Sequence, residues 1–216
     1  MRTPSSRTRS MLLPLAASLL LGCNAKDLTK PHDSTPNYPP AISADSTLAA
    51  LRMAYVGRDL TEYMSLFADS FKFVVAPMNL VRDPSLPVEW RLNVERRIHD
   101  RMFHRADVER IALSFTHPYT AVPDSTTVPG QRLWKVRLDG IRLDVFEQSA
   151  IGPIDYQVAS GTAEFYFEED AAHPIQGLPA WKIVLWRDEP SDKDTASNRT
   201  AIVGATWGQV KRLFLE

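Results

Sequence analysis

The chain has 216 residues, enough for one folded domain and a shorter processed or unstructured segment. Its 44% apolar and 24% charged residues are typical of a soluble globular protein and exclude a disordered or fibrous chain. The 25 Lys and Arg residues are balanced by 26 Asp and Glu residues, which argues against nucleic-acid binding, and the single cysteine excludes an internal disulfide and a cysteine-rich zinc site.

The amino terminus has the pattern of an export signal. Three arginines precede an apolar run over residues 11–21 (MLLPLAASLLL), and no acidic residue comes before Asp27. At about 1.5 Å per residue, this run is too short to cross a hydrocarbon core of about 30 Å. We therefore predict a secretory signal over residues 1–22 and leave it out of the fold prediction.

The sequence Leu20-Leu21-Gly22-Cys23 ends this run and resembles the lipobox of bacterial lipoproteins. The resemblance implies cleavage before Cys23 and acylation of that cysteine, whose acyl chains then anchor the protein in the lipid bilayer. Each buried methylene contributes about 0.8 kcal/mol, so two or three acyl chains hold a protein stably. Asn24 stands where Asp retains such lipoproteins at the inner membrane, so the resemblance implies the bacterial cell envelope, with the outer membrane favoured. An ordinary signal peptide that contains a cysteine is the alternative.

Residues 23–42 are predicted to form a tether. They contain four prolines and very few aliphatic side chains, and such a stretch does not bury enough apolar surface to fold alone. A proline-rich chain extends by about 3.1 Å per residue, so this tether can hold a domain up to about 60 Å from a membrane. Without residues 1–22 the chain has 22 basic and 26 acidic residues, so the predicted domain over residues 43–216 is not expected to attract nucleic acid.

The first half of this domain is predicted to contain three helices and a short strand. Apolar residues at helical spacing predict helices over residues 43–57, 59–67 and 88–103. The apolar residues 71–75 predict a short strand between the second and third helices. The third helix carries several arginines interspersed with Glu89, Glu95 and Asp100. These charged residues are predicted to face solvent.

The second half alternates with a period of two and predicts four long strands, over residues 111–115, 134–145, 156–167 and 181–188. The apolar side changes at Gly140, which a bulge within one strand and a two-residue hairpin explain equally well. A similar change occurs at Gly161. The last strand is apolar on both faces, with Ile183 and Leu185 on one and Val184 and Trp186 on the other. Its second face is therefore expected to be covered, either by a closing helix with Trp207 and Phe214 or by a second copy of the chain.

This order of elements resembles the nuclear-transport-factor-two-like (SnoaL-like, cystatin-like) superfamily over about residues 43–188. The resemblance rests on Leu60, Tyr63 and Phe67 leading into Phe71-Lys72-Phe73, and on Gly161, Phe165-Tyr166-Phe167 and Trp181-Lys182-Ile183 near the end. It implies an α+β cone, in which three N-terminal helices pack on a curved four-stranded antiparallel sheet and a short C-terminal helix follows. It also favours the bulge at Gly140. Some members are isomerases, dehydratases or cyclases, whereas others bind ligands or dimerise through the sheet, so the fold alone does not select a function.

No catalytic set emerges from the sequence. Asp144 and Glu164 are predicted to lie on the outer face of the sheet, beside Lys135, Arg137 and Arg142. His99 and His104 are five residues apart, about 140° around a helix, which is the wrong spacing for two metal ligands. We find no nucleophile elbow and no phosphate-binding loop. We therefore predict no catalytic residue, no metal site and no cofactor.

Aromatic residues are the best candidates for a binding site. Seven of them are predicted to point into the cone, where they fill it or line a ligand cavity: Tyr55, Tyr63, Phe67, Trp90, Phe115, Phe165 and Phe167. We expect an envelope lipoprotein that binds a small apolar ligand or a partner protein. The alternatives are an isomerase or dehydratase acting on a small hydrophobic substrate, and a structural adaptor that uses its sheet as an interface, including one between two copies.

Overall fold

The computed structural model describes residues 36–116, 119–127, 130–149, 152–189, 202–203 and 207–215. The predicted signal, Cys23 and most of the predicted tether lie outside these residues. In the described part the elements are α1 (Ala44–Gly57), α2 (Leu60–Ser65), β1 (Phe67–Val74), α3 (Pro77–Arg82), β2 (Glu89–Arg91), α4 (Leu92–His104), β3 (Val108–Ser114), β4 (Val122–Asp124), β5 (Leu133–Ser149), β6 (Gly152–Ile175), β7 (Leu178–Glu189), β8 (Ile202–Val203) and α5 (Trp207–Arg212). No described helix combines the length and the apolar character needed to span a bilayer.

The first two helices begin where the sequence predicts them. The Ser43 side chain caps α1 by accepting from the Ser46 N–H at 3.2 Å, and Asp59 caps α2 by accepting from the Glu62 N–H at 2.9 Å. Between them Arg58 adopts φ 54°, and its guanidinium donates to the backbone oxygens of Phe103, in the last turn of α4, and of Val108, at the start of β3. Arg58 therefore holds the junction between α1 and α2 against the C-terminal end of α4.

The third predicted helix starts later than expected. Residues 89–91 form β2, which pairs with β1 so that Trp90 lies opposite Phe73, and α4 begins at Leu92. The proline-containing loop before it holds an unpredicted helix, α3, in which Pro77 occupies the first turn, where its missing N–H costs nothing. Four helices therefore precede β3, and the prediction of three was wrong.

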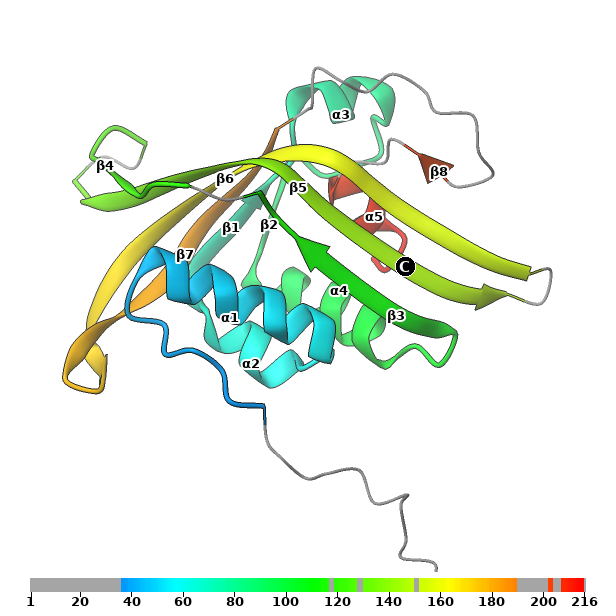
Figure 1. The fold of residues 1–216 in the computed structure, drawn as a ribbon. Coiled ribbons are helices and arrows are strands. Elements are labelled where there is room, and N and C mark those ends of the chain that lie inside the picture. Colours follow the sequence, from blue (N-terminus) through cyan, green and yellow to red (C-terminus); the bar gives the residue numbers. More distant parts are fainter. Residues whose placement is uncertain are drawn as a thin grey trace, which may run out of the picture. The chain divides into compact units, whose positions relative to one another are not determined.

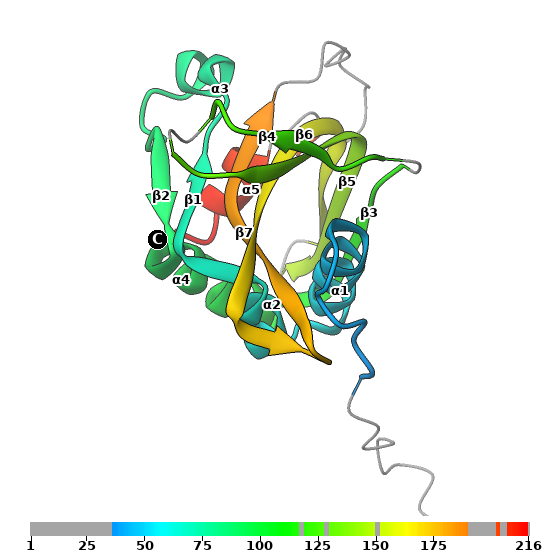
Figure 2. The same cartoon turned by 90° about the vertical axis from the view of Figure 1, so that its left-hand side faces the viewer.

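The sheet is mixed and wider than predicted. Its order is β2-β1-β7-β6-β5-β3, with β4 paired to β5 and β8 paired to β6. The predicted four-stranded antiparallel part, β3-β5-β6-β7, forms one side of the sheet and ends at the edge strand β3, whereas β1 runs parallel to β7 and β8 runs parallel to β6. Figures 1 and 2 show the long strands curving, with α1, α2, α4 and α5 on their concave side. We call the interior that they enclose the cone.

A bulge at Gly140 bends the sheet. β5 runs unbroken from Leu133 to Ser149, Gly140 has φ 75°, and the pairing with β6 shifts between Asp139 and Ile141. The bulge that the resemblance favoured is confirmed, and the hairpin is excluded. Ile141 pairs with Gly161 of β6, so the two glycines lie at the same level of neighbouring strands. Both strands therefore bend together, which gives the sheet its curvature.

The two faces of β7 differ from the prediction. A register shift against β6 places Ile183 and Trp186 in the main core, and Val184 and Leu185 in a small outer cluster with Tyr166. The predicted alternation was wrong because it assumed an unbroken period of two. The outer cluster borders a groove of about 370 Å³ that is also lined by Thr127 and Gln131, which follow β4. The closing helix α5 packs in the main core on the other face, as the position of Trp207 there shows.

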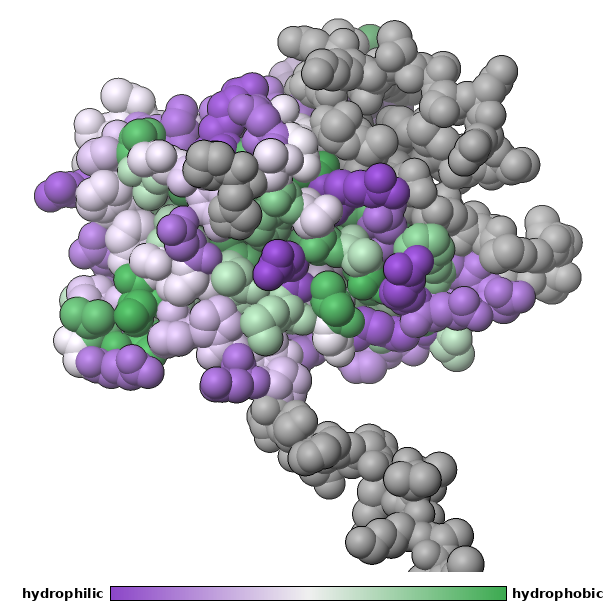
Figure 3. All heavy atoms as spheres, viewed as in Figure 1, coloured by the Kyte–Doolittle hydropathy of each residue, from purple (hydrophilic) through white to green (hydrophobic). Residues whose placement is uncertain are grey.

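Exposed apolar side chains are spread over the described surface. The large ones come from six separate places in the chain: Val56, Val81, Val88, Val122, Leu178 and Leu213. On the face in Figure 3, hydrophobic and hydrophilic residues are interspersed. This pattern gives no single apolar docking face among the described residues.

Candidate functional site

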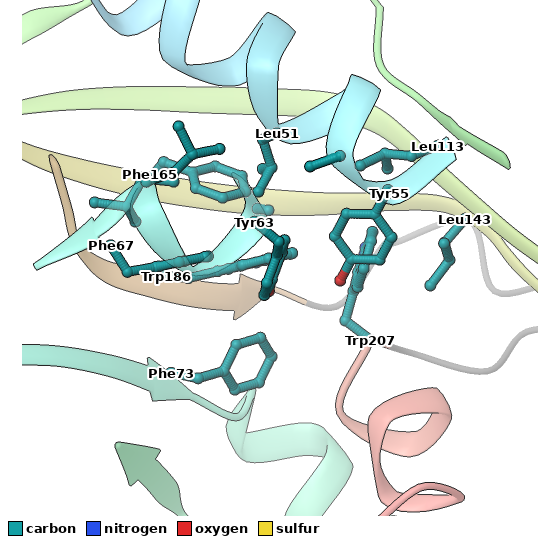
Figure 4. Close-up of a cluster of buried hydrophobic side chains, with 14 of the residues drawn as sticks. Leu51, Tyr55, Tyr63, Phe67, Phe73, Leu113, Leu143, Phe165, Trp186 and Trp207 are labelled. Carbon is teal, nitrogen blue, oxygen red and sulfur yellow. The ribbon is translucent and has the colours of Figure 1, made fainter. Parts of the chain in front are cut away.

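All seven aromatic residues predicted to point into the cone are buried there. Their side chains are between 0% and 9% exposed, and Phe115 is the most exposed of them. Their rings pack on one another, for example Tyr63 on Phe67 with centroids 4.8 Å apart, and Figure 4 shows several of them around the same interior. The predicted orientation is confirmed. Because the rings pack on one another, they fill the cone and do not line an open cavity between them. Their role in ligand binding stays a prediction.

The helix α5 contributes two further side chains to this interior. Trp207 is fully buried, with its ring centroid 4.8 Å from that of Trp186 and 5.8 Å from that of Tyr55. Lys211 lies one turn further along and is also fully buried. A buried lysine is rare unless a partner compensates its charge.

The partner of Lys211 is Glu95, on the inner face of α4. The Glu95 carboxylate is fully buried, and it accepts hydrogen bonds from Lys211 Nζ at 2.6 Å, Tyr63 Oη at 2.5 Å and Trp90 Nε1 at 2.6 Å. The prediction that Glu95 faces solvent was wrong. Glu95, Ile98 and Met102 share the spacing of one helix face, and that face turns into the cone.

Four aromatic rings surround the ammonium group of Lys211. Its Nζ lies 3.9 Å from the ring centroids of Phe73 and Trp186, and 5.8 Å from those of Trp90 and Trp207. The negative faces of aromatic rings attract cations at such distances, most strongly where water is excluded. We call Phe73, Trp90, Trp186 and Trp207 the aromatic cage.

His99 completes the buried polar cluster. Its Nδ1 lies 3.0 Å from the backbone oxygen of Glu95, and its Nε2 lies 2.5 Å from Tyr55 Oη. Because a carbonyl oxygen only accepts, Nδ1 carries the proton, and Nε2 accepts from the Tyr55 hydroxyl. The imidazole also stacks on Tyr63, with centroids 4.1 Å apart. Both ring nitrogens of His99 are therefore occupied.

Burial and charge determine the protonation of this cluster. Burial lowers the pKa of His99 to about 4, so the imidazole is neutral at pH 7. Burial also lowers the pKa of Lys211 to about 8, although Glu95 opposes the shift. The pKa of Glu95 is lowered, because the nearby Lys211 charge and the hydrogen bonds outweigh the effect of burial. At pH 7 the cluster thus holds one carboxylate, one ammonium and a neutral histidine.

A second polar contact secures α5 near its start. Asp188 of β7 accepts from Asn79 Nδ2 at 3.1 Å and from the Gly208 N–H at 3.2 Å. In contrast, the indole N–H groups of Trp186 and Trp207 are buried without a hydrogen-bond acceptor. A buried donor without a partner costs about 1 to 3 kcal/mol. The helix α5 is thus held firmly against the core, although this packing leaves two donors unsatisfied.

The other predicted polar residues lie outside the cone. Asp144 pairs with Arg142 at 2.9 Å, and Glu164 pairs with Lys135 at 3.5 Å and with Arg187 at 3.4 Å. These pairs agree with the predicted outer face. His104 contacts Asp100 at 3.0 Å on the exposed side of α4. Among the described residues, no group of three or more His, Cys, Asp or Glu side chains is placed to hold a metal ion.

The candidate-site side chains that the prediction missed are Glu95, His99 and Lys211. The four-residue spacing of Glu95 and His99, in phase with Ile98 and Met102, was the available signal. Lys211 follows Trp207 at the same spacing, but nothing in the sequence of α5 relates it to α4. The partner of a buried charge is identified only once both elements are placed.

Solved structures show what the fold is similar to. A nuclear transport factor 2 (NTF2-like) superfamily protein from Salmonella enterica matches 71% of this chain and 92% of its own length, with a TM-score of 0.43 and 11% identity. ActVI-ORFA from Streptomyces coelicolor matches 66% of this chain and 90% of its own length (TM-score 0.46, 13% identity), and AusH from Aspergillus nidulans matches 74% and 90% (TM-score 0.41, 14% identity). No family model and no curated protein matches the sequence. Identities this low concern the fold and assign no activity.

Proposed function

We propose that this protein acts by binding and not by catalysis, and that acylated Cys23 anchors it in the bacterial cell envelope, with the outer membrane favoured. One observation carries the first part: every acid or base inside the described cone is already engaged by another residue of the chain. The lipobox-like sequence before Cys23 supports the second part.

A proton-transferring isomerase or dehydratase needs a base with a lone pair directed at the substrate. Glu95 accepts from three donors and is paired with Lys211 at 2.6 Å, so its carboxylate is stabilised as the anion and is a weak base. His99 accepts from the Tyr55 hydroxyl on Nε2, its only unprotonated nitrogen. These contacts favour binding over the isomerase or dehydratase alternative.

The proposed binding position is the part of the cone that α5 now fills. Aromatic rings from α1, α2, β1 and β7 converge there with Trp207 (Figure 4), which is the composition of a small-molecule pocket. Moving α5 away exposes Trp207, Val210 and Phe214, and each exposed side chain costs about 1.5 to 3 kcal/mol of hydrophobic free energy. A ligand must therefore replace these apolar contacts as well as add its own.

A structural adaptor is the second candidate. The burial of the predicted cone aromatics favours it, because a filled cone needs no ligand. Such an adaptor would act through its exterior, with a partner protein or a second copy against the sheet. No nucleic-acid partner is proposed, because the chain is not basic.

The binding proposal is tested by what stays bound to the full chain. We expect mass spectrometry of the protein, purified in detergent from its own membranes and then denatured, to release a small organic molecule in a stoichiometric amount. Phe73→Leu should lower the recovery several-fold, because Phe73 forms part of the aromatic cage. The neighbouring variant Lys72→Ala is the matched control, since Lys72 lies on the outside and pairs with Glu89. Recovery of lipids alone, with a partner protein cross-linked instead, would reject ligand binding in favour of the adaptor.

The anchor is tested by replacing Cys23 with serine. The hydroxyl cannot accept the thioether-linked lipid, and a protein without acyl chains has no stable attachment to the bilayer. We expect the parent in the membrane fraction and Cys23→Ser in the soluble fraction after cell fractionation. If the variant sediments with the membranes as fully as the parent does, the lipoprotein assignment is wrong.

A further inference from the structure

The environment of Lys211 is that of a recognition site more than that of a simple ion pair. Aromatic rings approach the ammonium group at 3.9 Å from two elements, β1 and β7, and a carboxylate from α4 lies at 2.6 Å. Two further rings, Trp90 and Trp207, lie at 5.8 Å. Ring faces together with a carboxylate are the groups that recognise organic ammonium ions.

A stable core does not require this arrangement. A buried ion pair seldom stabilises a fold more than well-packed apolar residues of the same volume would, because both charges lose their hydration. The helix α5 has six residues and contributes one half of the pair. The packing of α5 against the core also leaves the indole N–H groups of Trp186 and Trp207 without acceptors.

We infer that the aromatic cage and Glu95 form a binding site for a primary ammonium group on a slender apolar stem, and that Lys211 occupies this site from within the chain. This inference rests on the proposed binding function and names its ligand class. Glu95 supplies the charge, and the rings select an organic cation over a hydrated metal ion, which they cannot coordinate. Lys211 thus shows how the ammonium group of a ligand would lie.

The test empties the site while keeping α5 in place. Lys211→Ala removes three methylenes and the ammonium group, so n-propylammonium has the shape of the missing atoms. Trp207, Val210 and Phe214 still hold α5 against the core. We expect n-propylammonium chloride to raise the melting temperature of this variant and to bind about tenfold more tightly than n-propanol, at matched ionic strength. The parent should show a much smaller shift than Lys211→Ala, because a ligand must first displace its Lys211 side chain.

Three controls separate recognition of the cation from filling of a cavity. Lys211→Met fills the space with a neutral chain and should not respond to n-propylammonium. Glu95→Gln combined with Lys211→Ala removes the carboxylate and should lose the preference for n-propylammonium over n-propanol. Lys72→Ala removes an exposed lysine and should behave as the parent. If Lys211→Ala is unfolded in plain buffer, the same titration is read as recovery of its near-ultraviolet circular dichroism.

Two results overturn the inference. One is equal stabilisation of Lys211→Ala by n-propanol and n-propylammonium, which would describe an apolar cavity. The other is a folded Lys211→Ala variant whose melting temperature rises no more with n-propylammonium than that of Lys211→Met. The outcome for the proposed function is separate, because a neutral molecule that co-purifies with the parent would support binding and reject the ammonium class. If n-propylammonium stabilises Lys211→Ala as expected but no ligand co-purifies with the parent, the result supports the ammonium site and rejects the proposed binding function.

Discussion

Replacing Glu95 with alanine is expected to lower the free energy of unfolding by about 3 to 5 kcal/mol, because it removes one partner of a buried ion pair. The variant leaves the Lys211 ammonium buried without a counter-charge. It also removes the acceptor of the Tyr63 hydroxyl and of the Trp90 indole N–H, which lie at 2.5 and 2.6 Å. Urea denaturation followed by tryptophan fluorescence measures the change, because Trp90 is part of the cluster.

An exposed pair provides the matched control. Lys72 and Glu89 lie 3.3 Å apart, and their side chains are 40% and 44% exposed. Solvent screens such pairs, so Glu89→Ala should change the free energy of unfolding by less than about 1 kcal/mol. Glu95→Leu combined with Lys211→Met should recover much of the stability lost in Glu95→Ala, because no charge remains buried. Equal effects of Glu95→Ala and Glu89→Ala would show that the buried pair makes no special contribution.

Acidification is expected to destabilise the protein through His99. Burial lowers the pKa of this imidazole from 6.5 to about 4 in the folded state. Below pH 6.5 the unfolded chain binds a proton that the folded chain excludes, so the stability that the neutral imidazole contributes is lost as the pH falls from 6.5 toward 4. A difference of this size corresponds to about 3 kcal/mol. Urea denaturation at a series of pH values between 7 and 4 measures it.

Two histidines of the same helix separate this effect from general acid denaturation. His99→Gln removes the buried titrating group, so its stability should fall less steeply with acidification than that of the parent. His104 is exposed and contacts Asp100, so His104→Gln should keep the slope of the parent. If His99→Gln and His104→Gln have the same pH dependence, His99 is not the group responsible.

Both effects arise from the same buried cluster, which links α4 and α5 across the cone. Glu95, His99 and Lys211 come from two helices, and their hydrogen-bond partners come from α1, α2 and the segment before α4. Removing one member leaves others unpaired, so their contributions are not additive. Ligand binding at the aromatic cage would disturb this same network, which is why stability and binding are best measured on the same variants.

The sequence alone determined the local features of this protein. The caps at Ser43 and Asp59, the helical face of α1 and the inward direction of the cone aromatics follow from the spacing of neighbouring residues, and each agrees with the structure. The register change at Gly140 was also visible, although local pattern left the bulge and the hairpin equally good. Such features depend on residues close in the chain, so periodicity reports them.

Only the tertiary structure decided the candidate site. In the sequence, Glu95 is one of several charges on a helix face predicted to be solvated, and Lys211 is one basic residue near the end of the chain. They meet because the curved sheet brings α4 and α5 to the same interior, 116 positions apart in sequence. A charge is stable in a core only when a distant partner compensates it, and no local pattern encodes the distance to that partner. The physical basis of the site is therefore the packing of the whole domain.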